Sequence, residues 1–432
     1  MNTQQIIRVI DFWQKTIEKN KLEDRLLVET LDYESKEIID IIGPRRSGKS
    51  SILKLIIKHL DLEDNFLFIN FEDPFFIENN SPHIIEEFIS VFKEYFNPNL
   101  KYLFLDEIQE INQWERAVRK LRDSGEFKIF ITGSSSKLLS GEVSTLLTGR
   151  HLSYKVFPLS FSEFLNFKNV NIKHKKDIIL NQKAIAKYFY KYMNIGSFPE
   201  VVLTENPELV KNYFYDILQK DIVMRYDIRE KEILEKIAIY SLSNSSKIMS
   251  IESLKKTFGI SFALTSSYVS YLKNSFLIFE LPQFSYSPKK QQRSLKKIYS
   301  IDSGLANAVS FRFSKDSGRI LENIVFLHLK MTGKEIYYYK TKNNLEVDFI
   351  IKERTEEKEL IQVSWSLDDK KTREREIKSL LSAMNELSIS KGLILTDYEE
   401  EVIIIGQKTI IVKPTYEWLL ETTSSKKVIT NC

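Results

Sequence analysis

The chain has 432 residues, of which 43% are hydrophobic, and this length and composition predict roughly two to four domains. Its 63 basic and 59 acidic residues leave a net charge of +4, so the overall charge does not indicate a nucleic-acid-binding protein. The one cysteine, Cys432, excludes a disulfide framework or a cysteine-based metal cluster within the chain, and it favours a reducing, cytoplasmic compartment.

The N-terminal segment, residues 1–21, mixes charged residues into its apolar positions. It therefore has neither the continuous apolar core of a signal peptide nor that of a membrane anchor. Since no other stretch is long and apolar enough to span a bilayer, the sequence predicts no membrane partner.

The next 120 residues or so alternate between strand-like and helix-like segments. A first apolar run at residues 37–42 ends at Gly43, and apolar residues then recur at helical spacing up to residue 60. Further apolar runs follow at residues 66–71, 102–105, 128–131 and 152–157, with helix-like stretches such as 83–95 between them. This alternation predicts an α/β fold in which a mostly parallel sheet is flanked by helices.

The segment between the first strand and the following helix matches the P-loop pattern in full. Its glycines let the backbone approach phosphates closely, and the amides at the helix N-terminus face the anion. The lysine would reach the β- and γ-phosphates, and the serine after it would offer its hydroxyl to Mg²⁺. The alternative, a turn with an incidental lysine, is disfavoured by the position between strand and helix. The predicted ATP site comprises Gly43, Pro44, Arg45, Arg46, Ser47, Gly48, Lys49, Ser50 and Ser51.

Two adjacent acids, Asp106 and Glu107, end the apolar run that begins at Tyr102. Open parallel sheets place their chemistry at the carboxyl ends of strands, which is where these acids fall. We expect Asp106 to hold Mg²⁺, and Glu107 to orient and polarise the water that attacks the γ-phosphate. Taken alone, the pair is equally consistent with a solvated strand end; the preceding P-loop favours the catalytic interpretation.

Two further segments are candidates for contacts with the γ-phosphate. Ser134, Ser135 and Ser136 follow the run at 128–133, where hydroxyls serve either as a sensor or as a helix N-cap. Arg150 precedes the last strand of the sheet, where its guanidinium could stabilise charge on a neighbouring subunit's nucleotide, or simply be a surface arginine.

The middle of the chain is expected to be helical over residues 161–235. Two short helices at 251–258 and 262–274 and a strand at 276–281 then follow the order of a winged helix. A basic stretch from Lys289 to Lys297 could contact DNA phosphates, or form a solvated loop. Because Lys273 is the only basic residue of the second helix, a structural or protein-binding role competes with DNA binding.

Strands predicted at 336–339, 347–351, 360–363 and 393–396 suggest a last small α/β domain.

These motifs together resemble the AAA+ branch of P-loop ATPases, and within it the archaeal and bacterial ATPases that join a winged helix to a nuclease-like domain. The resemblance covers most of the chain and rests also on residues 70–74, 147–150, 158–164, 196–200 and 297–305. It implies an AAA+ core at 1–160, a helical lid at 161–235, a winged helix at 236–300 and a restriction-endonuclease-like domain at 301–432.

The C-terminal region is similar to PD-(D/E)XK nucleases, in which two acids and an acid-x-lysine pair assemble around a divalent metal. Glu322 and Asp348 fit the first two positions. The third departs from the pattern, because Gln362 stands where an acid is expected and Ser364 where the lysine is expected. The loss of a charge that activates water predicts a degenerate nuclease site, unless Lys370 or Lys371 substitutes.

The leading hypothesis is an AAA+ ATPase that hydrolyses Mg·ATP and acts on nucleic acid, with DNA as the expected class. A second hypothesis is a slow ATP-dependent switch or defence scaffold that recruits a protein partner and has no nuclease activity. A third, an ATP-gated metal-dependent nuclease, requires a lysine that the motif lacks. Homo-oligomers occur among P-loop ATPases, but the sequence does not settle the assembly.

Overall fold

The computed structural model describes residues 3–19, 22–134, 149–310, 316–352 and 358–424. The chain divides into two compact units, the first ending at Phe157 and the second beginning at Pro158. The finer division of the second unit into lid, winged helix and C-terminal domain stays a prediction. Among the described helices, none is both long and apolar enough to cross a membrane.

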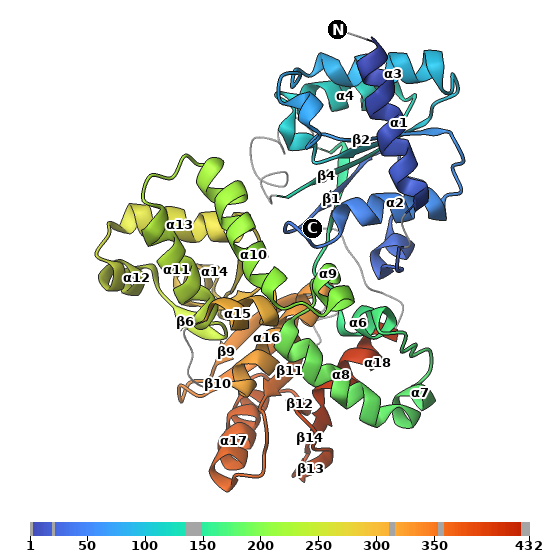
Figure 1. The fold of residues 1–432 in the computed structure, drawn as a ribbon. Coiled ribbons are helices and arrows are strands. Elements are labelled where there is room, and N and C mark those ends of the chain that lie inside the picture. The colour runs from blue at the N-terminus through green and yellow to red at the C-terminus, as the bar shows by residue number, and fades with distance from the viewer. Residues whose placement is uncertain (1–2, 20–21, 135–148, 311–315, 353–357, 425–432) are drawn as a thin grey trace. The chain divides into compact units, whose positions relative to one another are not determined.

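The first unit is built on a five-stranded sheet in which all neighbouring strands are parallel (Figure 1). The strand order is β2-β3-β4-β1-β5. Each strand matches an apolar run expected from the sequence, so the predicted α/β architecture is confirmed. The strands are β1 (Ile38–Ile42), β2 (Phe66–Asn70), β3 (Tyr102–Asp106), β4 (Lys128–Gly133) and β5 (His151–Lys155).

Helices cover this sheet on both faces. One core cluster packs Ile52 and Ile56 of α2 against Phe104 and Phe130 of the sheet. The alternate residues of the same strands, such as Leu105, point to the opposite face and are also fully buried. Helices and short turns of this unit are α1 (Thr3–Lys19), η1 (Leu26–Thr30), α2 (Lys49–His59), η2 (Pro74–Phe76), α3 (His83–Tyr95), η3 (Ile108–Glu110) and α4 (Trp114–Ser124).

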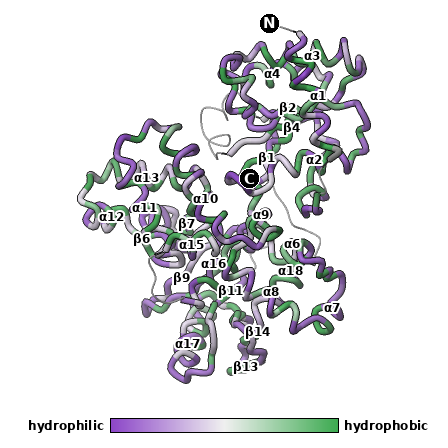
Figure 2. Tube along the Cα trace, in the orientation of Figure 1, coloured by the Kyte–Doolittle hydropathy of each residue, from purple (hydrophilic) through white to green (hydrophobic). Residues whose placement is uncertain are grey.

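The second unit begins with the helices predicted for residues 161–235. Figure 2 shows hydrophobic and hydrophilic residues interleaved along the helices, as expected when a helix buries one face. Ser160 caps the first of them through a capping box with Glu163, which explains part of the motif at 158–164. The helices are α6 (Phe161–Phe167), α7 (Lys175–Leu180), α8 (Gln182–Ile195), α9 (Pro199–Thr204), α10 (Glu208–Asp216), the π-helical η5 (Ile217–Met224) and α11 (Lys231–Ser243).

The segments at 196–200 and 297–305, far apart in sequence, meet around one buried carboxylate. Asp302 accepts hydrogen bonds from the amide and the hydroxyl of Ser197, each at 2.7 Å, and from the amide of Leu305 at 2.8 Å. Gly304 lies so close to the end of α8 that an added Cβ would stand 2.2 Å from the carbonyl oxygen of Ile195. These motif residues therefore hold α8 against α15 (Ser303–Val309).

The elements predicted as a winged helix are present. Helices α12 (Ile251–Phe258) and α13 (Phe262–Asn274) carry the bounds expected from the sequence. They are accompanied by a three-stranded antiparallel sheet of order β6-β8-β7. Its strands are β6 (Lys247–Met249), β7 (Ile278–Leu281) and β8 (Lys296–Ser300), and α14 (Pro288–Arg293) precedes β8.

The C-terminal region forms a mixed six-stranded sheet of order β13-β14-β12-β11-β10-β9. The four predicted strands are present, but β13 and β14 were not predicted, because the first of them is mostly exposed and gives no alternating pattern. The elements are α16 (Ser317–Met331), β9 (Glu335–Lys340), β10 (Glu346–Lys352), β11 (Lys358–Val363), α17 (Lys370–Glu386), β12 (Lys391–Thr396), β13 (Glu401–Ile405), β14 (Lys408–Pro414) and α18 (Thr415–Ser424).

Candidate functional site

The P-loop connects β1 to α2 at the carboxyl edge of the first sheet, as predicted. Gly48 has φ 96°, a left-handed conformation that favours glycine, and α2 begins at the next residue. Gly43 packs so closely that a Cβ there would lie 2.2 Å from the carbonyl oxygen of Val156. The first amides of α2, including those of Ser50 and Ser51, have no helical acceptors, so they are available to an anion.

Charged residues hold the loop in shape. Buried Arg25 donates from its two terminal nitrogens to the carbonyl oxygens of Ser47 and Phe157, each at 2.9 Å. Within the loop, the Ser47 hydroxyl donates to the carbonyl oxygen of Pro44 at 2.8 Å. Arg45 forms an ion pair with Glu72 at 2.5 Å, and Arg46 adopts φ 68°. Arg25 was not predicted, since a lone arginine 18 residues before the loop carries no local signal.

Asp106 lies at the end of β3, fully buried among hydroxyl and amide donors. It accepts from the Thr132 hydroxyl at 2.6 Å, from the Asn70 side-chain amide at 2.7 Å, and from Ser50. Burial and the neighbouring Glu107 raise the pKa of Asp106 to about 6, while the hydroxyls of Thr132 and Ser50 and the charge of Lys49 oppose the rise. Asp106 and Ser50 thus lie together, as the sequence predicted for a Mg²⁺ site.

Glu107 has a left-handed backbone, φ 52°, which turns its side chain toward the P-loop lysine. Its carboxylate lies 3.3 Å from the Lys49 ammonium and accepts from the Gln109 side-chain amide at 2.6 Å. Burial alone would raise the pKa of Glu107, but Lys49, Gln109 and Arg45 outweigh it and the net direction is down. Glu107 is therefore ionised at neutral pH.

The Lys49 ammonium also donates to the carbonyl oxygen of Pro44 at 3.3 Å, and the side chain is almost fully buried. The charge of Lys49 is thus engaged by the loop itself and by Glu107. Thr132 links the two acids, because its hydroxyl donates to Asp106 and accepts from the Glu107 amide at 2.9 Å. Thr132, Asn70 and Gln109 were not assigned roles from the sequence; a polar residue within an apolar strand was the available signal for Thr132.

The other γ-phosphate candidates are placed differently. Ser134 is buried just after β4, and Ser135 and Ser136 lie outside the described residues. Arg150 precedes β5, at the amino edge of the parallel sheet, where it pairs with Asp123 at 3.2 Å. Since the P-loop lies at the carboxyl edge, Arg150 does not join the site of its own chain, and a role toward a neighbouring subunit stays a prediction.

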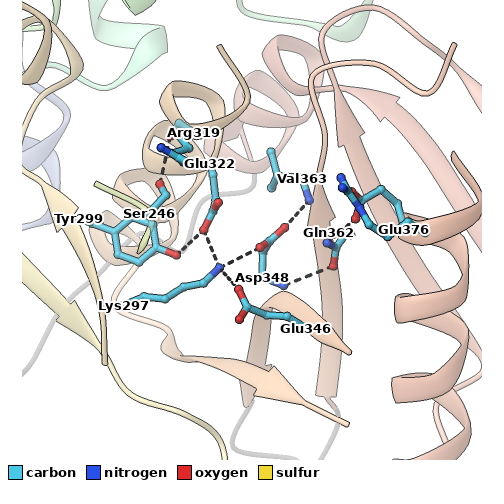
Figure 3. A network of polar contacts seen from close by, with 11 residues as sticks. Ser246, Lys297, Tyr299, Arg319, Glu322, Glu346, Asp348, Gln362, Val363 and Glu376 are labelled. Atoms are coloured by element: carbon cyan, nitrogen blue, oxygen red, sulfur yellow. Dashed lines mark hydrogen bonds and ion pairs between the residues drawn. The ribbon is translucent and has the colours of Figure 1, made fainter. Parts of the chain in front are cut away.

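A second cluster assembles the acids predicted for a nuclease-like site (Figure 3). The ammonium of Lys297, from β8, lies 2.9 Å from Glu322, 2.9 Å from Asp348 and 2.7 Å from Glu346. The Tyr299 hydroxyl donates to Glu322 at 2.7 Å. Burial, opposed by Lys297, raises the pKa of Glu322 to about 7. Lys297, Tyr299 and Glu346 were not predicted as members of this cluster.

Gln362 lies beside the cluster, but its groups are engaged elsewhere. Its amide nitrogen donates to Glu376 of α17 at 2.6 Å, and its oxygen faces the Asp348 amide at 3.4 Å. The second oxygen of Asp348 accepts from the Val363 amide at 2.9 Å. Lys370 and Lys371, the predicted substitutes for the missing lysine, are exposed at the start of α17. Lys297 contacts the acids instead.

The predicted DNA-contacting cations fall into two groups. Lys273 and Lys296 both pair with Glu280, at 2.7 and 3.0 Å, and Lys297 is buried among acids. The cations of α14 are exposed: Lys289, Lys290 and Arg293.

Comparison with known proteins places three family models along the chain. An AAA domain matches residues 35–165, and two domains of unknown function, DUF8612 and DUF4143, match residues 186–316 and 317–417. The AAA match agrees with the P-loop and the parallel sheet. Neither of the other two descriptions names a winged helix or a nuclease, so those assignments stay predictions.

Two relatives align with the chain along most of their own length. The protein MJ1544 of Methanocaldococcus jannaschii is 39% identical over 88% of this chain and 87% of its own length. A protein of Haemophilus influenzae is 28% identical over 92% of this chain and 98% of its own length. Among solved structures, AMPPCP-bound DnaA from Aquifex aeolicus aligns at 14% identity over 54% of this chain and 81% of that chain, with a TM-score of 0.23.

Proposed function

Because the chain belongs to the family of the uncharacterized protein MJ1544 and contains an AAA domain, we propose that it is an ATPase that binds Mg·ATP at the P-loop and hydrolyses it. One observation carries the proposal. Lys49, Asp106 and Glu107 converge at the carboxyl edge of the sheet, with the Lys49 ammonium 3.3 Å from Glu107. These are the charge-stabilising and water-orienting groups that phosphoryl transfer requires.

ATP binding would change the partners of Lys49. A triphosphate in the loop offers oxygens that compete with the Pro44 carbonyl and with Glu107 for the ammonium. Glu107 would then be released from its ion pair, while Gln109 continues to orient it. An ionised carboxylate held in this way is suited to orient and polarise the attacking water.

Ser50 and Asp106 would hold the magnesium ion that accompanies ATP. Both side chains present oxygen ligands, which Mg²⁺ prefers, and the Ser50 hydroxyl forms a hydrogen bond with the Asp106 carboxylate. With a pKa of about 6, Asp106 is ionised at neutral pH. When bound, the ion neutralises charge on the phosphates.

The test is ATP turnover by the full chain and by three single variants. Lys49→Ala should abolish turnover, and Glu107→Gln should lower it at least about 100-fold while retaining nucleotide. The matched control is Lys120→Ala, which removes an exposed lysine paired with Glu86 on the surface of the same unit. Unchanged turnover in Lys49→Ala would mean that a contaminant is the enzyme, and the proposal would fail.

We further propose that DNA is the partner. The support is the three exposed cations of α14, a helix that lies between β7 and β8 in sequence. Turnover should then rise with duplex, branched or single-stranded DNA. A variant with Lys289, Lys290 and Arg293 replaced by glutamate should lose that stimulation and keep basal turnover.

A specific observation favours the alternative of an ATP-dependent switch that recruits a protein. Lys273, the only cation of α13, is neutralised by Glu280, so this helix presents no unpaired positive charge to a phosphate backbone. Slow turnover that no DNA accelerates, combined with nucleotide-dependent assembly, would support the switch. An Arg150→Ala variant then tests whether Arg150 completes the site of a neighbouring subunit. If it does, the variant should lose turnover and keep ATP binding.

A further inference from the structure

We infer that the ammonium of Lys297 takes the place of a divalent metal in the C-terminal acidic cluster, so that this nuclease-like domain is organised around an internal cation. The inference concerns the second unit alone and does not depend on the proposed ATPase activity. It defines Lys297 as the residue that separates this site from a metal-dependent hydrolase.

The geometry around Lys297 is that of a cation enclosed by its ligands. Glu322 comes from α16, while Glu346 and Asp348 come from β10, and all three direct a carboxylate oxygen at the same nitrogen (Figure 3). The contacts with Glu322 and Asp348 are charge-assisted hydrogen bonds, each of 2.9 Å, and the contact with Glu346 is an ion pair at 2.7 Å. The Lys297 ammonium thus donates to two carboxylates and stands in ion-pair contact with a third.

This arrangement differs from that of a lysine which activates water. A catalytic lysine must offer a hydrogen to water or to the scissile phosphate, whereas the Lys297 side chain is 3% exposed and its ammonium is surrounded by three carboxylates. The Gln362 amide nitrogen is likewise engaged, by Glu376. Within the described ranges, no group of histidine, cysteine, aspartate or glutamate side chains is arranged to hold a metal ion.

Lys297 and its acidic partners come from different elements of the second unit. Lys297 belongs to β8, which pairs with β6 and β7 in the three-stranded sheet, whereas its partners belong to the C-terminal sheet and α16. Tyr299, two residues along the same strand, donates to Glu322 as well. The cluster therefore joins the three-stranded sheet to the C-terminal sheet and to α16.

The first experiment asks whether removing the ammonium exposes a metal site. Lys297→Ala leaves buried carboxylates without a counter-ion, so its Tm in EDTA should fall by about 5–15 °C. Millimolar MnCl₂, without nucleotide, should restore most of that loss. The double variant Lys297→Ala with Asp348→Asn should show no such recovery, and wild type should show no Tm shift with MnCl₂.

A second measurement does not require Lys297→Ala to fold. Mn²⁺ binding to nucleotide-free wild type, followed by electron paramagnetic resonance, should show no stoichiometric site that depends on Asp348. The inference is overturned if wild type binds one Mn²⁺ that is lost in Asp348→Asn and kept in Asp106→Asn. It is equally overturned if Mn²⁺ supports plasmid cleavage by wild type that Asp348→Asn abolishes, or if folded Lys297→Ala gains no Tm from Mn²⁺.

Discussion

Replacing Thr132 by valine tests whether Asp106 and Glu107, the two acids of the proposed ATP site, act as one positioned unit. The substitution keeps the shape of the side chain and removes a hydroxyl that donates to Asp106 at 2.6 Å and accepts from the Glu107 amide at 2.9 Å. A charge-assisted hydrogen bond and a newly unsatisfied buried amide together cost about 2–4 kcal/mol. Part of that cost falls on the position of Glu107, so kcat should drop about 10–100-fold.

The pH dependence gives a sharper readout than the rate alone. Asp106 must be ionised to hold magnesium, and its pKa is raised to about 6, so kcat/KM for Mg·ATP should fall as the pH drops through that value. The Thr132 hydroxyl stabilises the ionised form, so its removal raises the pKa of Asp106 further and moves the acid limb to higher pH.

The assay is steady-state ATP turnover between pH 5 and 8 for wild type, Thr132→Val and Thr132→Ser. Serine retains the hydroxyl and loses a methyl group, so its profile should stay close to that of wild type. If the valine variant keeps the wild-type kcat and an unshifted acid limb, Thr132 does not couple the acids, and the reasoning about this site is refuted.

Two further predictions concern stability. Gly304→Ala places a Cβ 2.2 Å from a backbone oxygen and should lower the Tm by several degrees, whereas Gly318→Ala, which meets nothing closer than 3.8 Å, should be neutral or stabilising; equal effects would contradict the packing of α8 against α15. Burial lowers the pKa of His328 to about 4, so the folded state favours the neutral ring. The neutral ring therefore contributes to the free energy of unfolding above the unfolded pKa of about 6.5, and this contribution is lost as the pH falls toward 4. Acidification from pH 7 to 4 should cost wild type about 3 kcal/mol more than His328→Gln in denaturant titrations, and parallel losses would disprove this role.

The residues of the proposed ATP site were brought together largely as expected, because their sequence signals are local. The P-loop is one continuous segment between a strand and a helix, and Asp106 and Glu107 directly follow an apolar strand. The parallel topology then brings the carboxyl ends of those strands to one edge, as general rules for α/β sheets require. Five strands of this sheet were expected from apolar runs, and all five formed.

Residues that act across the sheet were not predictable in the same way. Thr132 lies on the strand beside β3 and contacts Asp106 because of sheet order, which no local pattern encodes. Arg25 reaches the P-loop across 22 residues, and a single arginine in a mixed segment gives no periodic signal. The exposed edge strand β13 was missed because its side chains are not sorted by burial.

The C-terminal cluster shows the division most clearly. The resemblance to a known family pointed to Glu322 and Asp348, and the sequence has Ser364 where that motif has a lysine. The cation that contacts both acids comes instead from 25 residues before Glu322 and 51 before Asp348, on a strand of a different sheet. Local sequence patterns indicate which residues end a strand or begin a helix. Which cation neutralises a buried acid depends instead on which strands pack together, and only the tertiary fold decides that.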